Sequence, residues 1–172
     1  MLKGEDIVLM LKLAANPGVT PTVRELETET SIARSVVQRA LKRLIAAGLF
    51  DSRKGQVRRA QTEEFLIHGV PYVFPVSLGG ETRGIATAWG ASPLAEEIAL
   101  SRNDPSPVWP TASGQLRGPA LAPLHSAVPR AAVMDPALAE LLVLTDAIRA
   151  GDARIRGVAS RLLSDRLATP VP

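Results

Sequence analysis

Apolar and polar side chains recur with a helical period over residues 33–47. The apolar positions are separated by steps of one, three or four residues: Ala33, Val36, Val37, Ala40, Leu41 and Leu44. The positions between them are polar or basic: Arg34, Ser35, Gln38, Arg39, Lys42 and Arg43. Residues three and four apart share one face of a helix. The pattern therefore predicts an amphipathic helix with one buried side and one cationic side, which Gly48 ends.

Two helices are predicted ahead of this amphipathic helix. Residues 4–15 carry apolar residues at helical spacing, and the Asn-Pro-Gly sequence at residues 16–18 stops that helix. Thr20 and Pro21 are typical of the start of the next helix, with threonine as the cap and proline at the first helical position. Residues 30–32 then form a tight connection.

A basic β-hairpin is predicted after the amphipathic helix. Residues 49–51 and 56–59 are expected to be short strands, joined by the turn Arg53-Lys54-Gly55. The order of helix, three-residue turn, helix and basic hairpin is that of a winged helix-turn-helix. We therefore predict such a DNA-binding domain within residues 1–69, which also hold a short helix at 61–69.

Residues 70–130 have a different character, because proline and glycine interrupt them. Short β-prone segments are predicted at residues 72–74, 108–109 and 115–117, and one or two helical turns at 94–100. The glycines between residues 79 and 84 indicate a turn. Three aromatic side chains need burial, so a small module is expected here and not a linker: Phe74, Trp89 and Trp109.

Residues 135–150 and 152–167 are typical of a helical hairpin. Asp135-Pro136 is a capped start, Gly151 is the break, and Asp152 can cap the second helix. The predicted fold class is therefore α+β. It combines an N-terminal winged helix-turn-helix, a small β-containing middle module and a C-terminal helical hairpin, with residues 70–172 as a second domain for a partner, a ligand or dimerisation.

Positive charge is concentrated in the predicted winged helix-turn-helix. Residues 31–60 hold eight Lys or Arg against one acid, Asp51, whereas residues 61–172 hold nine Arg against eleven acids. This distribution is expected of a phosphate-binding face. The candidate DNA-binding residues are Arg34, Ser35, Gln38, Arg39, Lys42 and Arg43 on the helix, and Arg53, Lys54, Arg58 and Arg59 on the hairpin.

The residue types within this candidate set suggest different roles on double-stranded DNA. Gln38 and Arg39 can donate to base edges in the major groove, where glutamine suits adenine and arginine suits guanine. Arg34 and Ser35 lie near the helix start, where they can reach bases or phosphates. The two basic residues further along the helix are expected to meet phosphates, and the hairpin is expected to follow the DNA backbone or enter the minor groove.

Residues 20–59, TPTVRELETETSIARSVVQRALKRLIAAGLFDSRKGQVRR, resemble the winged helix-turn-helix of bacterial transcriptional regulators of the MarR-like class. The resemblance implies a regulator, in particular a repressor. Two positions depart from the usual pattern. Ser31 stands where a turn glycine is common, and Ala33 stands where a capping serine is common, so the start of the amphipathic helix must be held by other means.

Segments of the remaining chain resemble proteins in which a winged helix-turn-helix precedes a module of a toxin–antitoxin pair with a nucleotidyltransferase-type toxin. They are TRGIATAWGASPL, VWPTASGQLRGPALAPLH and LLVLTDAIRAGDARIRGVASRLL. That resemblance implies an alternative function, an antitoxin that neutralises a partner toxin through residues 70–172 and autoregulates its operon.

Catalysis, metals and cofactors are not expected. The chain has no cysteine, which excludes thiolate chemistry and is consistent with a reducing cytoplasm. The only two histidines, His68 and His125, are far apart in sequence, and the glycines near residue 80 fit no phosphate-binding motif. An enzyme tethered to nucleic acid by the winged helix remains the rival interpretation, and a winged helix that binds protein or RNA is another.

A homodimer and a cytoplasmic location complete the expectations. Most bacterial operators are two-fold symmetric, and the apolar helices at 135–167 could supply the contact between two copies. The sequence contains no run of eighteen apolar residues, so no membrane span is expected.

Overall fold

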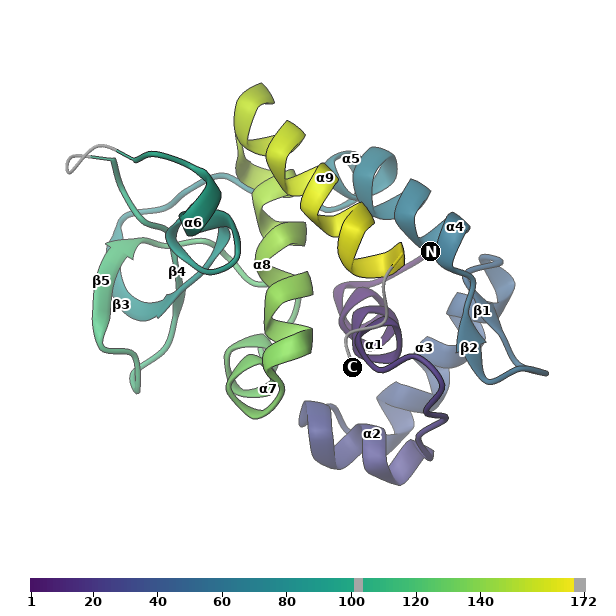
Figure 1. Ribbon diagram of the computed structural model, residues 1–172. Helices are drawn as coiled ribbons and strands as arrows, with labels where there is room; N and C mark the ends of the chain where they lie inside the picture. Colours follow the sequence, from purple (N-terminus) through teal and green to yellow (C-terminus); the bar gives the residue numbers. More distant parts are fainter. Residues whose placement is uncertain (101–103, 169–172) are drawn as a thin grey trace.

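The computed structural model describes residues 1–100 and 104–168, and it confirms the α+β class (Figure 1). Three helices and a two-stranded hairpin come first: α1 (Gly4–Ala15), α2 (Val23–Thr30), α3 (Arg34–Ala46), β1 (Phe50–Asp51) and β2 (Gln56–Val57). The order and the bounds agree with the predicted winged helix-turn-helix to within a few residues. Helix α1 has the predicted bounds. Its apolar residues are buried inside the domain, and no side of the helix is left exposed.

The start of α2 differs from the prediction. The cap is Thr22, and Thr20-Pro21 precede the helix as an extended segment. Thr22 and Glu25 form a reciprocal capping box, in which the Glu25 N–H donates to Thr22 Oγ1 at 3.2 Å and the Thr22 N–H donates to Glu25 Oε2 at 2.6 Å. This pair satisfies two backbone donors, whereas a cap at Thr20 would place no acid three residues on.

The turn between α2 and α3 is made without glycine. Ser31 has φ 58° and ψ 25°, the left-handed conformation that favours glycine, and its N–H donates to the Glu27 carbonyl. Ala33 at the start of α3 makes no side-chain cap. The carboxylate of Glu27 acts in its place, because Glu27 Oε1 accepts the Arg34 N–H at 3.0 Å. A side chain on α2 therefore holds the beginning of α3.

The Ser31→Gly variant should be more stable than the native chain by about 0.5–1 kcal/mol, because glycine reaches the left-handed conformation without a steric penalty. Urea unfolding followed by circular dichroism measures the difference. The matched control is Ser160→Gly in the middle of α9 (Ala153–Ala168), where the same exchange should lower stability by about 0.5 kcal/mol. A loss of stability in Ser31→Gly would show that the turn is not strained at this residue.

A longer helical run than predicted follows the hairpin. It comprises α4 (Arg59–Glu64), a π-helical segment (Phe65–Gly69) and α5 (Val70–Val73). The predicted strand at residues 72–74 is therefore wrong, and the predicted boundary between residues 69 and 70 falls inside this run. Proline cannot donate a backbone hydrogen bond and crowds the preceding turn. Just ahead of Pro71 the Val70 N–H bonds five residues back, to the Phe65 carbonyl, and this wider turn accommodates the ring.

The middle module is a three-stranded antiparallel sheet in the order β4-β3-β5. Its strands are β3 (Glu81–Ala86), β4 (Val108–Pro110) and β5 (Leu116–Pro119), and α6 (Leu94–Glu97) supplies the predicted helical turn. The predicted turn at residues 79–84 is wrong from Glu81 onward, because this segment is the central strand. Gly84 lets β4 pack closely against this strand, since a Cβ there would lie 2.1 Å from the Trp109 carbonyl oxygen.

Three helices complete the chain: α7 (Val128–Met134), α8 (Pro136–Ala150) and α9 (Ala153–Ala168). The predicted helical hairpin corresponds to α8 and α9, whereas α7 is an addition. Asp135 caps α8 by accepting the Leu138 N–H at 3.1 Å, and Asp152 caps α9 by accepting the Ile155 N–H at 2.9 Å. Within the described residues, no helix is long and apolar enough to cross a bilayer.

One hydrophobic core runs through both halves of the chain. Helix α8 lies at its centre, with every residue from Leu141 to Arg149 buried, and packs against α1, α5, α7 and α9 (Figure 1). The apolar faces of the helical hairpin, on which the expected dimer contact rested, are therefore used inside one chain. A division into domains at residue 69 remains a prediction, and the core is continuous across it.

Candidate nucleic-acid interface

Helix α3 has a buried face and an exposed face. Val37, Ala40 and Leu44 are fully buried against the rest of the domain. The opposite face is exposed to solvent with the whole described chain present, and its residues are Arg34, Ser35, Gln38, Arg39 and Lys42. We call these five residues the recognition face. The C-terminal helices do not cover these side chains, which remain accessible to solvent.

Arg34 is partly occupied by a neighbour on α2. Its Nε donates to Glu27 Oε2 at 3.2 Å, and the two side chains are 55% and 37% exposed. An ion pair this exposed contributes little to stability, because water and salt screen it. A phosphate can therefore compete with Glu27 for the Arg34 guanidinium.

Arg43 does not belong to the recognition face, which corrects the sequence-based prediction. Its guanidinium points to α1 and grips Asp6 with two bonds, Nε to Oδ2 at 2.7 Å and Nη2 to Oδ1 at 2.6 Å. Glu5 accepts a third bond at 3.2 Å. The hydrogen bonds that Arg43 donates to Asp6 raise the pKa of Arg43 above its ordinary value. Because Asp6 is fully buried, this pair fixes α3 against α1 and directs the Arg43 guanidinium toward α1.

The hairpin β1–β2 carries three exposed basic residues. Phe50 pairs with Val57 and Asp51 pairs with Gln56 in antiparallel register. Asp51 Oδ1 accepts the backbone N–H groups of Arg53 and Lys54 at 3.0 and 3.2 Å, and these bonds lower the pKa of the Asp51 carboxyl. The ordered turn thus points two cations away from the body of the protein.

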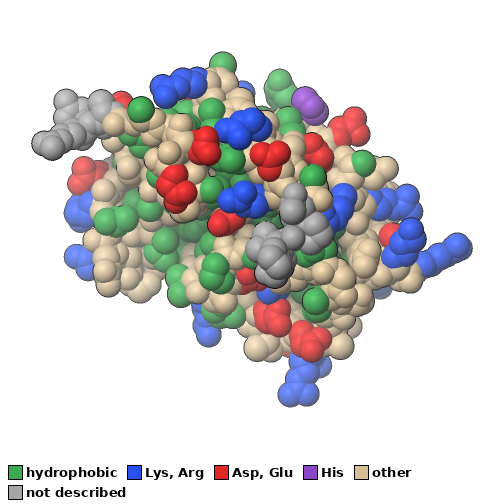
Figure 2. All heavy atoms as spheres, in the orientation of Figure 1, with side chains coloured by type: hydrophobic (Ala, Val, Ile, Leu, Met, Phe, Trp, Pro, Cys, Tyr) green, Lys and Arg blue, Asp and Glu red, His purple; other side chains and the backbone are tan. Residues whose placement is uncertain are grey.

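The exposed basic side chains of the hairpin are Arg53 and Lys54 in its turn and Arg58 directly after β2, at its base. The hairpin follows α3 directly and contacts it, and Figure 2 shows basic side chains projecting at the edge of the molecule where the hairpin lies in Figure 1. The structure thus brings these three residues and the recognition face together on one domain, as a winged helix-turn-helix requires.

Arg59 is the second candidate residue whose position differs from the prediction, because it does not lie on the hairpin. The predicted strand ends at Val57, and Arg59 is the first residue of α4. Its guanidinium donates to the carbonyl of Leu167 near the end of α9, and the residue is half-buried. Arg59 therefore joins the winged helix-turn-helix to the C-terminal helix, where a cation is favoured by the helix dipole.

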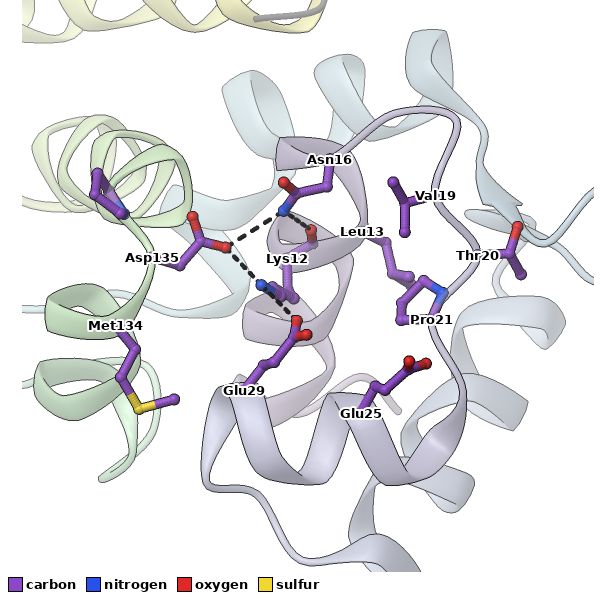
Figure 3. A pocket seen from close by; sticks show the side chains of 11 residues that line it. Lys12, Leu13, Asn16, Val19, Thr20, Pro21, Glu25, Glu29, Met134 and Asp135 are labelled. Atoms are coloured by element: carbon purple, nitrogen blue, oxygen red, sulfur yellow. Dashed lines mark hydrogen bonds and ion pairs between the residues drawn. The ribbon is translucent and has the colours of Figure 1, made fainter. Parts of the chain in front are cut away.

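Sequence reasoning missed a buried ionic cluster on the other side of the domain (Figure 3). Lys12 on α1 donates to Glu29 on α2 at 2.8 Å and to the capping residue of α8, Asp135, at 2.6 Å. Asn16 also donates to Asp135, at 3.3 Å. The cluster ties the two halves of the chain together. Sequence could not reveal it, because more than a hundred residues separate Lys12 from Asp135.

The two central groups of this cluster hold each other in the charged state. Burial alone would lower the pKa of Lys12 and raise that of Asp135. Hydrogen bonds and charge attraction outweigh burial: Asp135 and Glu29 raise the pKa of Lys12, and Lys12, with the Leu138 N–H and Asn16, lowers the pKa of Asp135. The ion pair is therefore intact across the neutral pH range.

Within residues 1–100 and 104–168, no group of three or more His, Asp or Glu side chains could hold a metal ion. His68 is exposed, and His125 accepts the Ala127 N–H at its Nδ1 at 3.1 Å, as part of a local turn. The histidines therefore have positions typical of surface and turn residues.

Comparison with known proteins gave one match. Residues 5–59 match the model of the MarR family, a segment that runs from the first turn of α1 to the first residue of α4. No curated protein and no solved structure matched the chain. The resemblance of the remaining segments to toxin–antitoxin proteins thus found no support. The N-terminal third of this protein, and with it the recognition face and the hairpin, is MarR-like.

Proposed function

We propose that this protein is a transcriptional regulator that binds double-stranded DNA in a sequence-specific manner. Helix α3 would lie in the major groove and the hairpin β1–β2 would serve as the wing. The observation that carries the proposal is the division of α3: its apolar residues are buried, while Gln38, Arg39 and Lys42 are exposed on one cationic face. The MarR family match over the same residues supports the same function.

Each exposed residue has a proposed contact. Arg39 can form two hydrogen bonds to the O6 and N7 atoms of guanine, and Gln38 can pair with adenine. Ser35 can reach a base edge or a phosphate near the start of the helix. Lys42 and the three basic residues of the hairpin neutralise phosphates, which releases counterions and makes the affinity fall steeply with salt.

We further propose that the protein acts as a cytoplasmic repressor and as a homodimer. A protein that occupies a promoter blocks transcription by excluding polymerase. Two copies on a two-fold symmetric operator would place one α3 in each half-site, and the binding energies of the two half-sites add. The uncovered recognition face is compatible with this arrangement.

Fluorescence anisotropy on the DNA upstream of the protein's own gene tests the proposal. The Arg39→Ala variant should bind that DNA about 10- to 100-fold more weakly, and a shuffled duplex only slightly more weakly, because Arg39 contacts bases. Equal losses on the two duplexes would remove Arg39 from the base-reading set.

Two further variants separate phosphate contact from general charge. Lys54→Ala should weaken binding to both duplexes alike and reduce the slope of log affinity against log salt by about one unit. The control Arg154→Ala removes the same charge from the exposed start of α9 and should leave the slope unchanged. If the native protein binds neither duplex measurably even at low salt, the proposed function is refuted.

A further inference from the structure

Helix α7 ends in an exposed apolar ridge. Val133 is 70% exposed and Met134 is 45% exposed, and they are consecutive residues in the last turn of the helix. We call this pair the α7 ridge. Single exposed apolar side chains are common on soluble proteins, but an adjacent pair raised between two hollows provides a contact point for another surface.

A hollow lies on each side of the α7 ridge, which stands between the three-stranded sheet and α2 (Figure 1). The first hollow, of about 490 Å³, is formed by α1, α2 and the segment that joins them, with Val19 and Pro21 in its wall (Figure 3). The second, of about 620 Å³, lies against the sheet and includes Ile85. Met134 lines both hollows, so the ridge is the wall that they share.

The two hollows carry opposite charge. Three carboxylates line the first hollow against the single cation Lys12: Glu25, Glu29 and Asp135. Arg130 lines the second hollow. Beyond it, Arg83 and Arg117 lie directly opposite each other on β3 and β5, both exposed. Arg117 Nε also pairs with Glu81 Oε1 on β3 at 3.2 Å, so this flank carries three arginines against one acid and keeps a positive charge. In Figure 2 basic side chains lie over the sheet and α7 and acidic side chains over α2, with apolar side chains between them, while acid also lies at the sheet edge and a basic side chain projects below α2.

A surface with an apolar ridge at its centre, acid on one flank and base on the other, is complementary to a copy of itself. In a two-fold interface each patch meets the patch on the opposite side of the axis. The ridges would then lie on the axis, and the acidic hollow of each copy would face the basic hollow of the other. Opposite charges at such contacts also select the correct orientation.

We propose that the α7 ridge and its two hollows are the surface through which two copies of this chain associate. The proposal rests on the homodimer of the proposed function and names its contact surface. The helical hairpin cannot supply that surface, since the apolar faces of α8 and α9 are buried within one chain. The recognition face and the tip of the hairpin β1–β2 line neither hollow, so both copies keep them free for DNA.

Analytical ultracentrifugation of the full chain tests the apolar centre. The native protein should sediment as a dimer in low salt. The double variant Val133→Ser, Met134→Ser should self-associate at least about 30-fold more weakly, since it removes two exposed apolar side chains from the contact. The matched control is Tyr72→Ser, Val73→Ser at α5, where both residues are also exposed. A native monomer, or a dimer broken by the control and not by the ridge variant, would overturn the proposal.

Exchange of charges tests the orientation of the two copies. Arg130→Glu and Glu29→Arg should each be monomeric, because each places like charges across the two-fold contact. An equimolar mixture should form a heterodimer, in which both contacts again join opposite charges. Lys12 keeps Asp135 as a partner in Glu29→Arg, so that variant retains its buried pair. A mixture that stays monomeric would contradict the predicted pairing of hollows.

DNA binding distinguishes failure of this inference from failure of the proposed function. The monomeric ridge variant should still bind a duplex without sequence preference and with a salt slope, because its recognition face is intact. If the ridge variant remains a dimer and DNA binding is normal, only the contact surface is wrong. If neither the native protein nor the ridge variant binds DNA, the proposed function fails, and the sedimentation result still decides whether the α7 ridge is a dimer contact.

Discussion

The Arg149→Ala variant should lose about 3–5 kcal/mol of unfolding free energy, the largest effect that we expect of any single substitution. Arg149 and Asp146 form a buried ion pair on α8, with Nη1 to Oδ1 at 2.6 Å and side chains only 5% and 2% exposed. Removal of the guanidinium leaves a carboxylate inside the core without its counter-charge, and this is costlier than the loss of the bond itself.

The same pair connects the middle module to α8, which adds to the expected loss. Asp146 Oδ2 accepts the Trp109 indole N–H at 2.5 Å and the Thr87 hydroxyl at 3.2 Å. Arg149 donates to the backbone carbonyls of Phe74 and Ala122 at 3.0 and 3.3 Å. Without Arg149, two buried carbonyls also lose their donor.

Urea unfolding should show the loss as a lower midpoint, and heating should show a melting temperature lower by roughly 10 °C. The control Arg154→Ala, an exposed arginine five residues on, should change stability by less than about 0.5 kcal/mol. A loss of under 1 kcal/mol in Arg149→Ala would mean that the buried pair contributes no more than a surface pair does.

The pH dependence of Arg149→Ala gives a second test. Burial raises the pKa of Asp146, and Arg149 counteracts it. In the variant the folded-state pKa should rise further, so the native state binds the proton more tightly than the unfolded state does. The difference in unfolding free energy between the variant and the unmutated protein should therefore shrink as the pH falls through that folded-state pKa. A deficit that does not depend on pH would show that Asp146 remains uncharged or solvated.

Local patterns in the sequence predicted the elements that depend on local interactions. The spacing of apolar residues placed α3 at 33–47, and the structure places it at Arg34–Ala46. The caps Asp135 and Asp152 were predicted because each needs only the N–H three residues on. The recognition face was predicted for the same reason, because the helical period determines which residues share a side of the helix.

Long-range contacts account for what sequence could not predict. The glycine-rich segment at 79–84 forms the central strand because β4 and β5 pair with it from more than 20 residues away. Arg39 and Arg43 are four residues apart on the same helix, so the sequence pattern places both on its basic side. Their surroundings differ because only Arg43 contacts the buried Asp6 of α1. Arg59 is held by α9, more than a hundred residues on. The period of a helix says which residues share a face, and tertiary partners decide which cations remain free.

The contrast between Arg39 and Arg43 leads to the second large effect. Arg43→Ala should lose about 3 kcal/mol of unfolding free energy, because it leaves the fully buried Asp6 with only the Lys3 N–H, at 2.8 Å, as a donor. Arg39→Ala removes an exposed side chain four residues earlier on the same helix and should change stability by less than about 0.5 kcal/mol.

Urea unfolding of the two variants, read beside their DNA affinity, separates a residue that positions α3 from one that contacts DNA. A double-mutant cycle with Asp6→Ala should give a coupling energy of about 2 kcal/mol or more with Arg43, and none with Arg39. At a temperature where it is still folded, Arg43→Ala should keep the salt slope of native DNA binding, since its charge neutralises no phosphate. If the slope drops by one unit instead, Arg43 leaves Asp6 when DNA binds, and α3 must shift on α1 to release it.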